Sequence, residues 1–142
     1  MKYWSKEWTE AIKEASHTDK DYLSKTKGWD VKALWVVTGC PEGVDKCMEF
    51  HLESGKVVFI SLEEKPSPSD LATLPWDASK YFVRVIAPYD IFAKINTKEW
   101  SAMKAISSGL FVIEGRVQEL IERISQFACF CSELLPSIPV EY

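Results

Sequence analysis

Apolar side chains recur at helical spacing over residues 3–15. They are Trp4, Trp8, Ala11, Ile12 and Ala15. Intervals of three and four residues predict an amphipathic helix with one face to bury. A short second helix is expected next, since Thr18 followed three residues later by Asp21 is typical of a capping box and Gly28 is typical of a helix end.

The pattern changes to that of β-strands in the next part of the chain. Residues 31–37 are β-branched and aromatic, and turn-forming residues at 38–43 close this run. Over residues 47–53 apolar and polar side chains alternate, so one face of that strand is expected to be buried. Ser54-Gly55 then leads into KVVFISLEE, which predicts an antiparallel hairpin whose second strand places Val58, Ile60 and Leu62 on the same buried face.

An irregular loop and a fourth strand are predicted after the hairpin. Residues 65–79 contain three prolines and several small polar residues, which indicates a loop long enough to have a function of its own. The apolar run at 81–87 predicts a strand. Pro88 fits the first turn of the helix that Ile91 and Phe92 indicate.

The last third is expected to contain two more helices and a fifth strand. Thr97 is predicted to cap a helix that turns Trp100 and Met103 toward the core. Residues 110–115 are expected to form a short strand. Apolar residues at helical spacing from 117 to 135 then predict the longest helix of the chain.

This order of elements predicts a single α+β domain over residues 1–142. We expect a five-stranded, mostly antiparallel sheet with helices packed on one face. A chain of 142 residues falls in the usual size range of one domain. Its 46% hydrophobic and 13% aromatic content excludes a disordered chain.

Net charge and hydropathy limit the kinds of partner that are expected. The net charge is -4 and no cluster of Lys and Arg exceeds two residues, so nucleic acid is not an expected partner. No stretch approaches the roughly 20 apolar residues that span a bilayer, and the N-terminus lacks the pattern of a secretion signal. The expectation is a cytoplasmic protein without integral membrane association.

Candidate chemistry is sparse. His51 lies between Glu49 and Glu53 on the polar face of a strand, which can imitate a metal-ligand set, but a solvated sheet face gives the same pattern and is favoured. Arg84 stands alone among apolar neighbours. It could bind an anionic head group, but an exposed edge position or a salt bridge is favoured. Motifs for phosphate loops, nucleophile elbows and helix-borne zinc sites do not occur, so neither an enzyme nor a cofactor is expected.

The four cysteines do not indicate a disulfide framework or a zinc site. They are Cys40, Cys47, Cys129 and Cys131, without a CxxC pair. Ordinary buried thiols are favoured over a zinc site or disulfides. What stands out instead is a surplus of large aromatic residues, which either pack solid or line a cavity.

The second half of the chain carries a family resemblance. An aromatic in a helix, a small-residue segment, a glycine, a short strand, a second glycine and a long final helix follow one another. Here these are Phe92 or Trp100, Ala102-Met103, Gly109, Phe111-Val112-Ile113, Gly115 and residues 117–134. In these features the chain resembles the sterol carrier protein family, from about Trp29 to Leu134.

The resemblance implies a hydrophobic tunnel between sheet and helices that accepts a fatty acid, a fatty acyl-CoA or a sterol-like lipid. The expected function is therefore non-enzymatic binding or transfer of such a ligand. Ligand-binding residues are predicted on inward faces: Met48, Phe50, Phe92, Trp100, Met103, Phe111, Leu120, Ile124 and Phe127. The alternative is a protein interaction or dimerisation domain with a solid core, and a monomer and a weak dimer both remain open.

Overall fold

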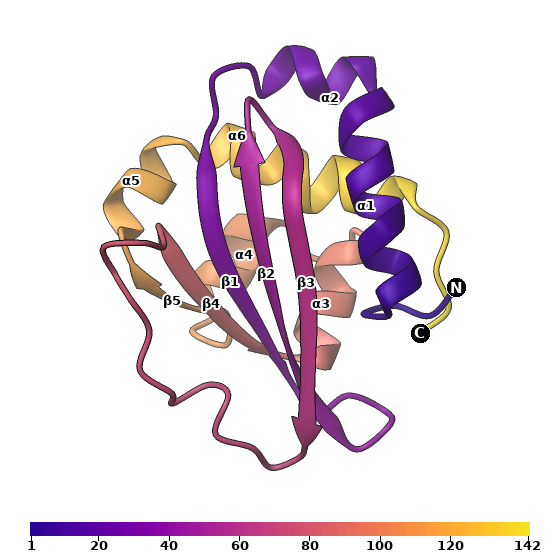
Figure 1. Cartoon of the computed structure of the whole chain (residues 1–142), viewed down its shortest axis with the longest axis vertical. Helices are drawn as coiled ribbons and strands as arrows, with labels where there is room; N and C mark the ends of the chain where they lie inside the picture. Colours follow the sequence, from indigo (N-terminus) through magenta and orange to yellow (C-terminus); the bar gives the residue numbers. More distant parts are fainter.

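The computed structural model describes all residues 1–142, and a five-stranded sheet forms its centre (Figure 1). The strands are β1 (Val31–Thr38), β2 (Val44–Glu53), β3 (Lys56–Pro66), β4 (Val83–Pro88) and β5 (Val112–Gly115). Their order across the sheet is β3-β2-β1-β4-β5. Only β1 and β4 are parallel; the other three pairs are antiparallel. The predicted mostly antiparallel sheet of five strands is confirmed.

One face of the sheet forms the core. Ala33, Trp35 and Val37 of β1 and Met48 and Phe50 of β2 are all buried on this face, as the alternation of their side chains requires. A β-bulge between His51 and Leu52 shifts the pairing with β3, so that the residue opposite Leu52 is Val57.

The bulge changes which valine of β3 is buried. Val57 has no exposed surface, whereas Val58 is 44% exposed. The prediction that Val58 faces the core is therefore wrong, because a bulge adds one residue and reverses the alternation beyond it. Ile60 and Leu62 do pack against the core as expected.

Helices cover the core face from both ends of the chain (Figure 1). They are α1 (Lys6–Thr18), α2 (Lys20–Lys25), α3 (Tyr89–Asn96), α4 (Ala102–Ser107), α5 (Val117–Glu122) and α6 (Ile124–Ala128), followed by a π-helical segment (Cys129–Leu134) and a 3₁₀ turn (Leu135–Ser137). None of these helices combines the length and hydrophobicity needed to span a membrane.

The helix starts differ in detail from the sequence-based expectations. The side chain of Asp19, not Thr18, caps α2 by accepting a hydrogen bond from the Tyr22 amide. Ser101 caps α4, while Thr97 follows the end of α3. Each of these side chains can serve as an N-cap, so the residue type alone does not fix the position.

The C-terminal helical region is not one long helix, and the longest helix is α1 with 13 residues. The helix stops at Arg123, whose backbone φ is -113°, before α6 begins. Beyond α6 the wider turn of the π-helical segment brings Cys129, Phe130 and Cys131 all into buried positions. A π turn takes up an additional residue, which apolar spacing does not reveal.

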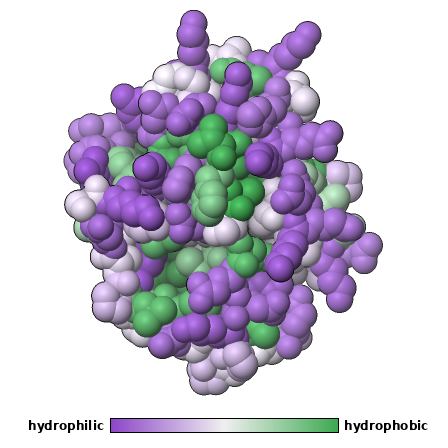
Figure 2. Space-filling view, in the orientation of Figure 1, coloured by the Kyte–Doolittle hydropathy of each residue, from purple (hydrophilic) through white to green (hydrophobic).

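The opposite face of the sheet is partly covered by the loop between β3 and β4. Leu71 in this loop and Val36 on that face of β1 are both buried outside the main core. Arg84 is 5% exposed and donates to Glu114 Oε1 at 2.6 Å and to the Leu74 carbonyl. The salt-bridge interpretation of Arg84 is therefore confirmed. Around the loop the surface is mostly polar, with apolar patches over the sheet (Figure 2).

Candidate functional site

An apolar chamber lies between the sheet and the α5-α6 segment. We call it the outer chamber; its lining is hydrophobic except for one arginine. The lining residues are Trp29, Val31, Ala33, Trp35, Phe50, Phe82, Val83, Leu120, Arg123, Phe127 and Phe130. Its free volume is about 10 Å³, which is room for one water molecule at most. The chamber is therefore nearly closed in this conformation.

A second chamber, the inner chamber, shares Trp35 with the outer chamber. Tyr3, Trp35, Phe92, Ile95, Asn96, Phe111, Cys131 and Leu135 line it. Its free volume is also about 10 Å³. Trp35 belongs to both linings, and Phe111 of the inner chamber also contacts Phe127 of the outer chamber, with ring centroids 6.4 Å apart.

Aromatic packing around Trp35 explains why both chambers are closed. The Trp35 ring stacks on Phe92 with centroids 5.5 Å apart, and it meets Phe50 and Phe130 edge to face at 5.2 and 5.7 Å. Each such pair contributes about 0.5–1.5 kcal/mol beyond the burial of its surface. Separating the rings to admit a ligand therefore requires the ligand to replace these contacts.

The outer chamber meets a solvent-open cleft at the break between α5 and α6. Both are lined by Trp29, Val31, Phe82 and Arg123. The cleft has a volume of about 730 Å³ and also contains Arg116, whose guanidinium lies 6.0 Å from the Phe82 ring centroid. Asp30, Glu119 and Glu122 line the same cleft, and Arg116 lies 3.9 Å from the Glu119 carboxylate, so the mouth of the outer chamber carries charges of both signs.

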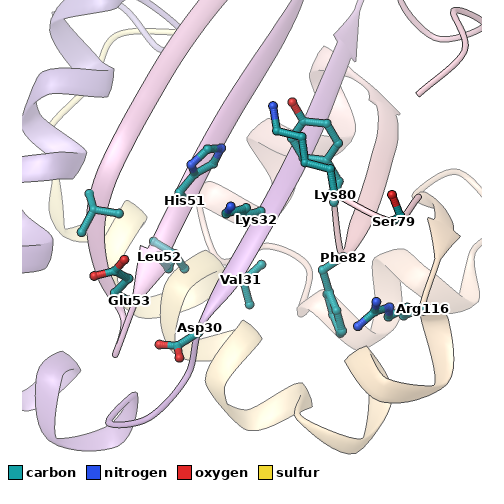
Figure 3. A pocket seen from close by; sticks show the side chains of 12 residues that line it. Asp30, Val31, Lys32, His51, Leu52, Glu53, Ser79, Lys80, Phe82 and Arg116 are labelled. Atoms are coloured by element: carbon teal, nitrogen blue, oxygen red, sulfur yellow. The ribbon is translucent and has the colours of Figure 1, made fainter. Parts of the chain in front are cut away.

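A neighbouring cleft of about 740 Å³ continues over the ends of β1 and β2 (Figure 3). Figure 3 shows the acidic side chains of Asp30 and Glu53 toward one end of the cleft and Arg116 beside Phe82 toward the other end. Lys32 lies between these two groups. Asp30 accepts a hydrogen bond from the Ser54 amide at 2.8 Å, so this carboxylate stabilises the β2-β3 turn. The cleft offers charges of both signs to the polar part of a ligand.

The histidine of this cleft is not part of a metal site. His51 Nε2 lies 2.7 Å from Glu49 Oε2, and its ring packs against Phe59 with centroids 4.8 Å apart. No group of three His, Cys, Asp or Glu side chains in the chain is arranged to hold a metal ion. The arrangement fits the favoured interpretation of a polar sheet face.

The nine predicted ligand-binding residues fall into separate places. Phe50, Leu120 and Phe127 line the outer chamber, and Phe92 and Phe111 line the inner chamber. Met48 has no exposed surface and lies in the core without lining either chamber.

The other three predicted residues, Trp100, Met103 and Ile124, line a shallow groove on the surface near α4 and α6. Met103 is 48% exposed, so its predicted inward orientation is wrong. The reason is that α4 begins only at Ala102 and buries its two alanines, which turns Met103 toward solvent.

Sequence reasoning missed several residues that line the chambers. Trp35 could have been identified from the sequence, because it alternates with Ala33 and Val37 on the inward face of β1. Phe130 lies in a sequence with helical spacing, but the π-helical segment determines which way its side chain points. Asn96 could not have been identified, because nothing in the sequence distinguishes a buried asparagine at a helix end from an exposed one.

All four thiols are free. Burial raises the pKa of Cys40, Cys47 and Cys129 to about 11, and it raises the pKa of Cys131, in the inner chamber, well above the usual value. These thiols are protonated and poorly nucleophilic at neutral pH, since the thiolate is the reactive form.

The chain has the fold of sterol carrier protein 2, as the resemblance predicted. A conserved hypothetical protein of Thermus thermophilus, described as possibly a sterol carrier protein, has a TM-score of 0.77 at 12% identity, with 99% of this chain and 92% of that chain covered. A crystal structure of sterol carrier protein 2 has a TM-score of 0.76 at 11% identity, covering 97% and 100%. No protein-family model and no curated protein matches the sequence. At these identities the likeness shows the fold alone.

Proposed function

We propose that this protein binds a fatty acid, a fatty acyl-CoA or a sterol-like lipid in a tunnel formed when its two chambers join. The observation that carries the proposal is that two apolar chambers share Trp35 in their linings, in a domain with the sterol carrier protein 2 fold. Rotation of one indole ring, together with movement of its aromatic neighbours, would connect them.

Helix α5, which covers the outer chamber, is weakly attached to the rest of the domain. α5 buries only Leu120, and it is separated from α6 by the break at Arg123. A short helix with one buried side chain has little apolar surface holding it to the sheet, so it can open at low cost. This motion would enlarge the chamber beyond its closed volume.

Apolar burial supplies the affinity. A ligand that buries about ten methylenes gains on the order of 8 kcal/mol before the costs of ordering and of opening the core are subtracted. Arg123, which lines both the outer chamber and the cleft, would receive the carboxylate or phosphate of an anionic lipid at the entrance through charge-assisted hydrogen bonds, whereas Arg116 already lies 3.9 Å from the Glu119 carboxylate. This arrangement favours an orientation in which the apolar chain enters first.

A carrier is favoured over an enzyme by the composition of the chambers. Apart from the indole groups, Tyr3, Asn96, Cys131 and Arg123 are their only polar or ionisable lining residues, and the Cys131 thiol is protonated because burial raises its pKa. Such a lining can hold a ligand, but it offers no pair of nucleophile and base. We therefore infer binding and release without bond chemistry.

The second candidate function is an interaction domain with a solid core. The small free volume of both chambers favours it, as do Val58 and Phe59 on the edge strand β3, each 44% exposed. Protein purified without detergent should be extracted with organic solvent, and its native mass measured in parallel. A stoichiometric lipid supports the carrier, whereas a lipid-free protein that refuses fluorescent fatty acids and dimerises with concentration supports the interaction domain.

A further inference from the structure

The shallow surface groove near α4 and α6 is separate from both chambers, and we call it the helix groove. Trp100, Ala102 and Met103 line it from α4 and the residues just before this helix. Ile124, Ala128 and Ser132 line it from α6 and the π-helical segment. None of these residues lines a chamber, so the helix groove is a surface feature that the proposed function does not use.

The lining of the helix groove is apolar but open to solvent. Met103 is 48% exposed, and Trp100 and Ile124 are half-buried. The groove has a volume of about 330 Å³, which is at the lower limit for a pocket that encloses a small ligand. A contiguous apolar surface of this kind on a soluble domain is typical of a site that binds another molecule.

Lysine side chains gather beside this apolar lining. Lys94 Nζ lies 4.7 Å from the centroid of the Trp100 ring, and Lys104 Nζ lies 5.1 Å from the same centroid. The two ammonium groups therefore cannot be farther apart than the sum of these distances. Lys98 lines the groove itself. Cation–π attraction to the indole holds the first two ammonium groups near each other despite their like charge.

None of these three lysines forms an ion pair. All ion pairs of the structure involve other groups. Residues 94–104 contain three lysines and a single acidic residue, Glu99, in a chain whose net charge is -4. The rim of the helix groove is thus locally positive on an acidic protein. Such a rim attracts a partner whose charge is negative at the matching positions.

We propose that the helix groove is the docking site for an acidic amphipathic helix of a partner protein. Apolar side chains from one face of that helix enter the groove, in the manner of other complexes in which a helix lies in an apolar groove. Acidic side chains beside this face pair with Lys94, Lys98 and Lys104 through charge-assisted hydrogen bonds. This proposal does not depend on lipid binding, since the groove and the chambers share no lining residue.

The shape of the site favours a helix over an anionic membrane. A membrane surface takes up apolar side chains that project from the protein, whereas Trp100 and Ile124 are half-buried in a hollow. A hollow instead receives side chains that project from its partner. A second copy of this chain is also disfavoured, because α1, its helix with the most glutamates, buries the apolar residues Trp8 and Ile12 in its own core.

The test uses two stapled peptides of about 18 residues, or five helical turns. Both have leucine on one face; one has glutamate and the other lysine on the remaining positions. Each is titrated into the ¹⁵N-labelled full chain, and the Trp100 indole resonance is assigned by its absence in Trp100→Phe. We expect the acidic peptide to shift this resonance and to bind at least about tenfold more tightly than the basic peptide. High salt should weaken its binding.

Variants assign the binding to the helix groove. Lys94→Gln combined with Lys104→Gln should weaken binding of the acidic peptide about fivefold, the factor that two exposed ion pairs supply. Met103→Gln, which keeps a helix-forming side chain of similar length, should weaken it about tenfold because an amide is then buried against leucine. Lys13→Gln combined with Lys20→Gln is the matched control, since both lysines are exposed and lie on α1 and α2.

Each contrary outcome overturns the docking site. The acidic peptide could fail to bind, or bind without shifting the Trp100 resonance. An equal loss in the Lys13 and Lys20 control shows general attraction to positive charge. Phosphatidylglycerol vesicles that bind in place of the peptide, and lose binding in the groove variants, identify a membrane as the occupant. Dimerisation that the groove variants abolish identifies a second copy. Binding of a fluorescent fatty acid, measured in parallel, tests the lipid-binding function separately.

Discussion

Replacing Leu120 by tryptophan should block the outer chamber. Leu120 is 3% exposed and faces this chamber from α5, where the free volume is about 10 Å³. A tryptophan side chain has six more non-hydrogen atoms than leucine. It fits only by occupying space that a ligand would need after the chamber opens.

The expected loss of affinity follows from the displaced chain. If the indole excludes about five methylenes at about 0.8 kcal/mol each, the loss is roughly 4 kcal/mol, or about a thousandfold in the dissociation constant. Overpacking the closed core should cost a further ~1–3 kcal/mol of folding stability. Binding must therefore be measured on protein whose circular dichroism and thermal transition show that it is folded.

Ile124→Trp is the matched control for this experiment. Ile124 lies four residues further along, but it lines the surface groove with Trp100 and Met103. Displacement of a fluorescent fatty acid should give an affinity within about twofold of the original for this variant, since no chamber contact changes. If folded Leu120→Trp binds as tightly as the unmodified protein, or if both variants lose affinity equally, the ligand does not occupy the outer chamber.

Three further predictions address the entrance, the C-terminal cover and the sheet. Arg123→Glu should weaken binding of decanoate about tenfold or more, because it replaces attraction by repulsion at the entrance, and it should leave binding of decan-1-ol unaffected. Lys6→Glu at the start of α1 is the charge-matched control. An equal loss of decanoate affinity in both variants would refute a local role of Arg123. Deletion of residues 136–142 should speed ligand release in stopped-flow measurements, because it removes the buried Ile138 and the Tyr142 bond to Asn96 next to the inner chamber; an unchanged off-rate would contradict this. Asp45→Asn should lower the free energy of unfolding at pH 7 by about 1–3 kcal/mol, since Asp45 accepts from Gly39 N, Ser69 N and Ser69 Oγ. Burial raises the pKa of Asp45, but these hydrogen bonds outweigh it and hold the pKa below its usual value. The stabilisation is therefore present at neutral pH and is lost as pH falls through the lowered pKa. In denaturant unfolding, the free energies of unfolding of the two proteins should become equal in acid. A constant difference between them down to about pH 2 would refute this account.

The sheet could be predicted from sequence, because side chains along a strand alternate between two faces and the apolar ones identify the buried face. Five strands were expected within a few residues of their observed positions, and the inward faces of β1 and β2 follow directly from their side chains. The prediction failed where the period itself changes. The bulge beside Leu52 exchanges Val57 and Val58, and the π-helical segment turns three consecutive residues inward.

The candidate site was harder to predict, because a site depends on free volume and unpaired atoms. Apolar periodicity identifies Phe50, Leu120 and Phe127 as inward, but it cannot tell a packed residue from one that lines a chamber. Met103 was misplaced because α4 turns Ala102 and Ala105 toward the core, and small apolar residues give a weaker hydrophobic pattern than Trp100 and Met103 do. The unpaired Oδ1 of Asn96 depends on Tyr142, 46 residues away, a contact that no local pattern encodes.

The division of the C-terminal cover bears on how the proposed ligand could enter a core that is closed in this structure. The break at Arg123 separates α5 from Cys131 and Leu135, which line the inner chamber from the π-helical segment and the 3₁₀ turn. Opening at α5, as proposed, would therefore expose the outer chamber without moving these two residues. On the proposed function, a ligand that enters at α5 would gain apolar contacts in the outer chamber first, and it would reach the inner chamber only by displacing the Trp35 ring from its contacts with Phe50 and Phe92.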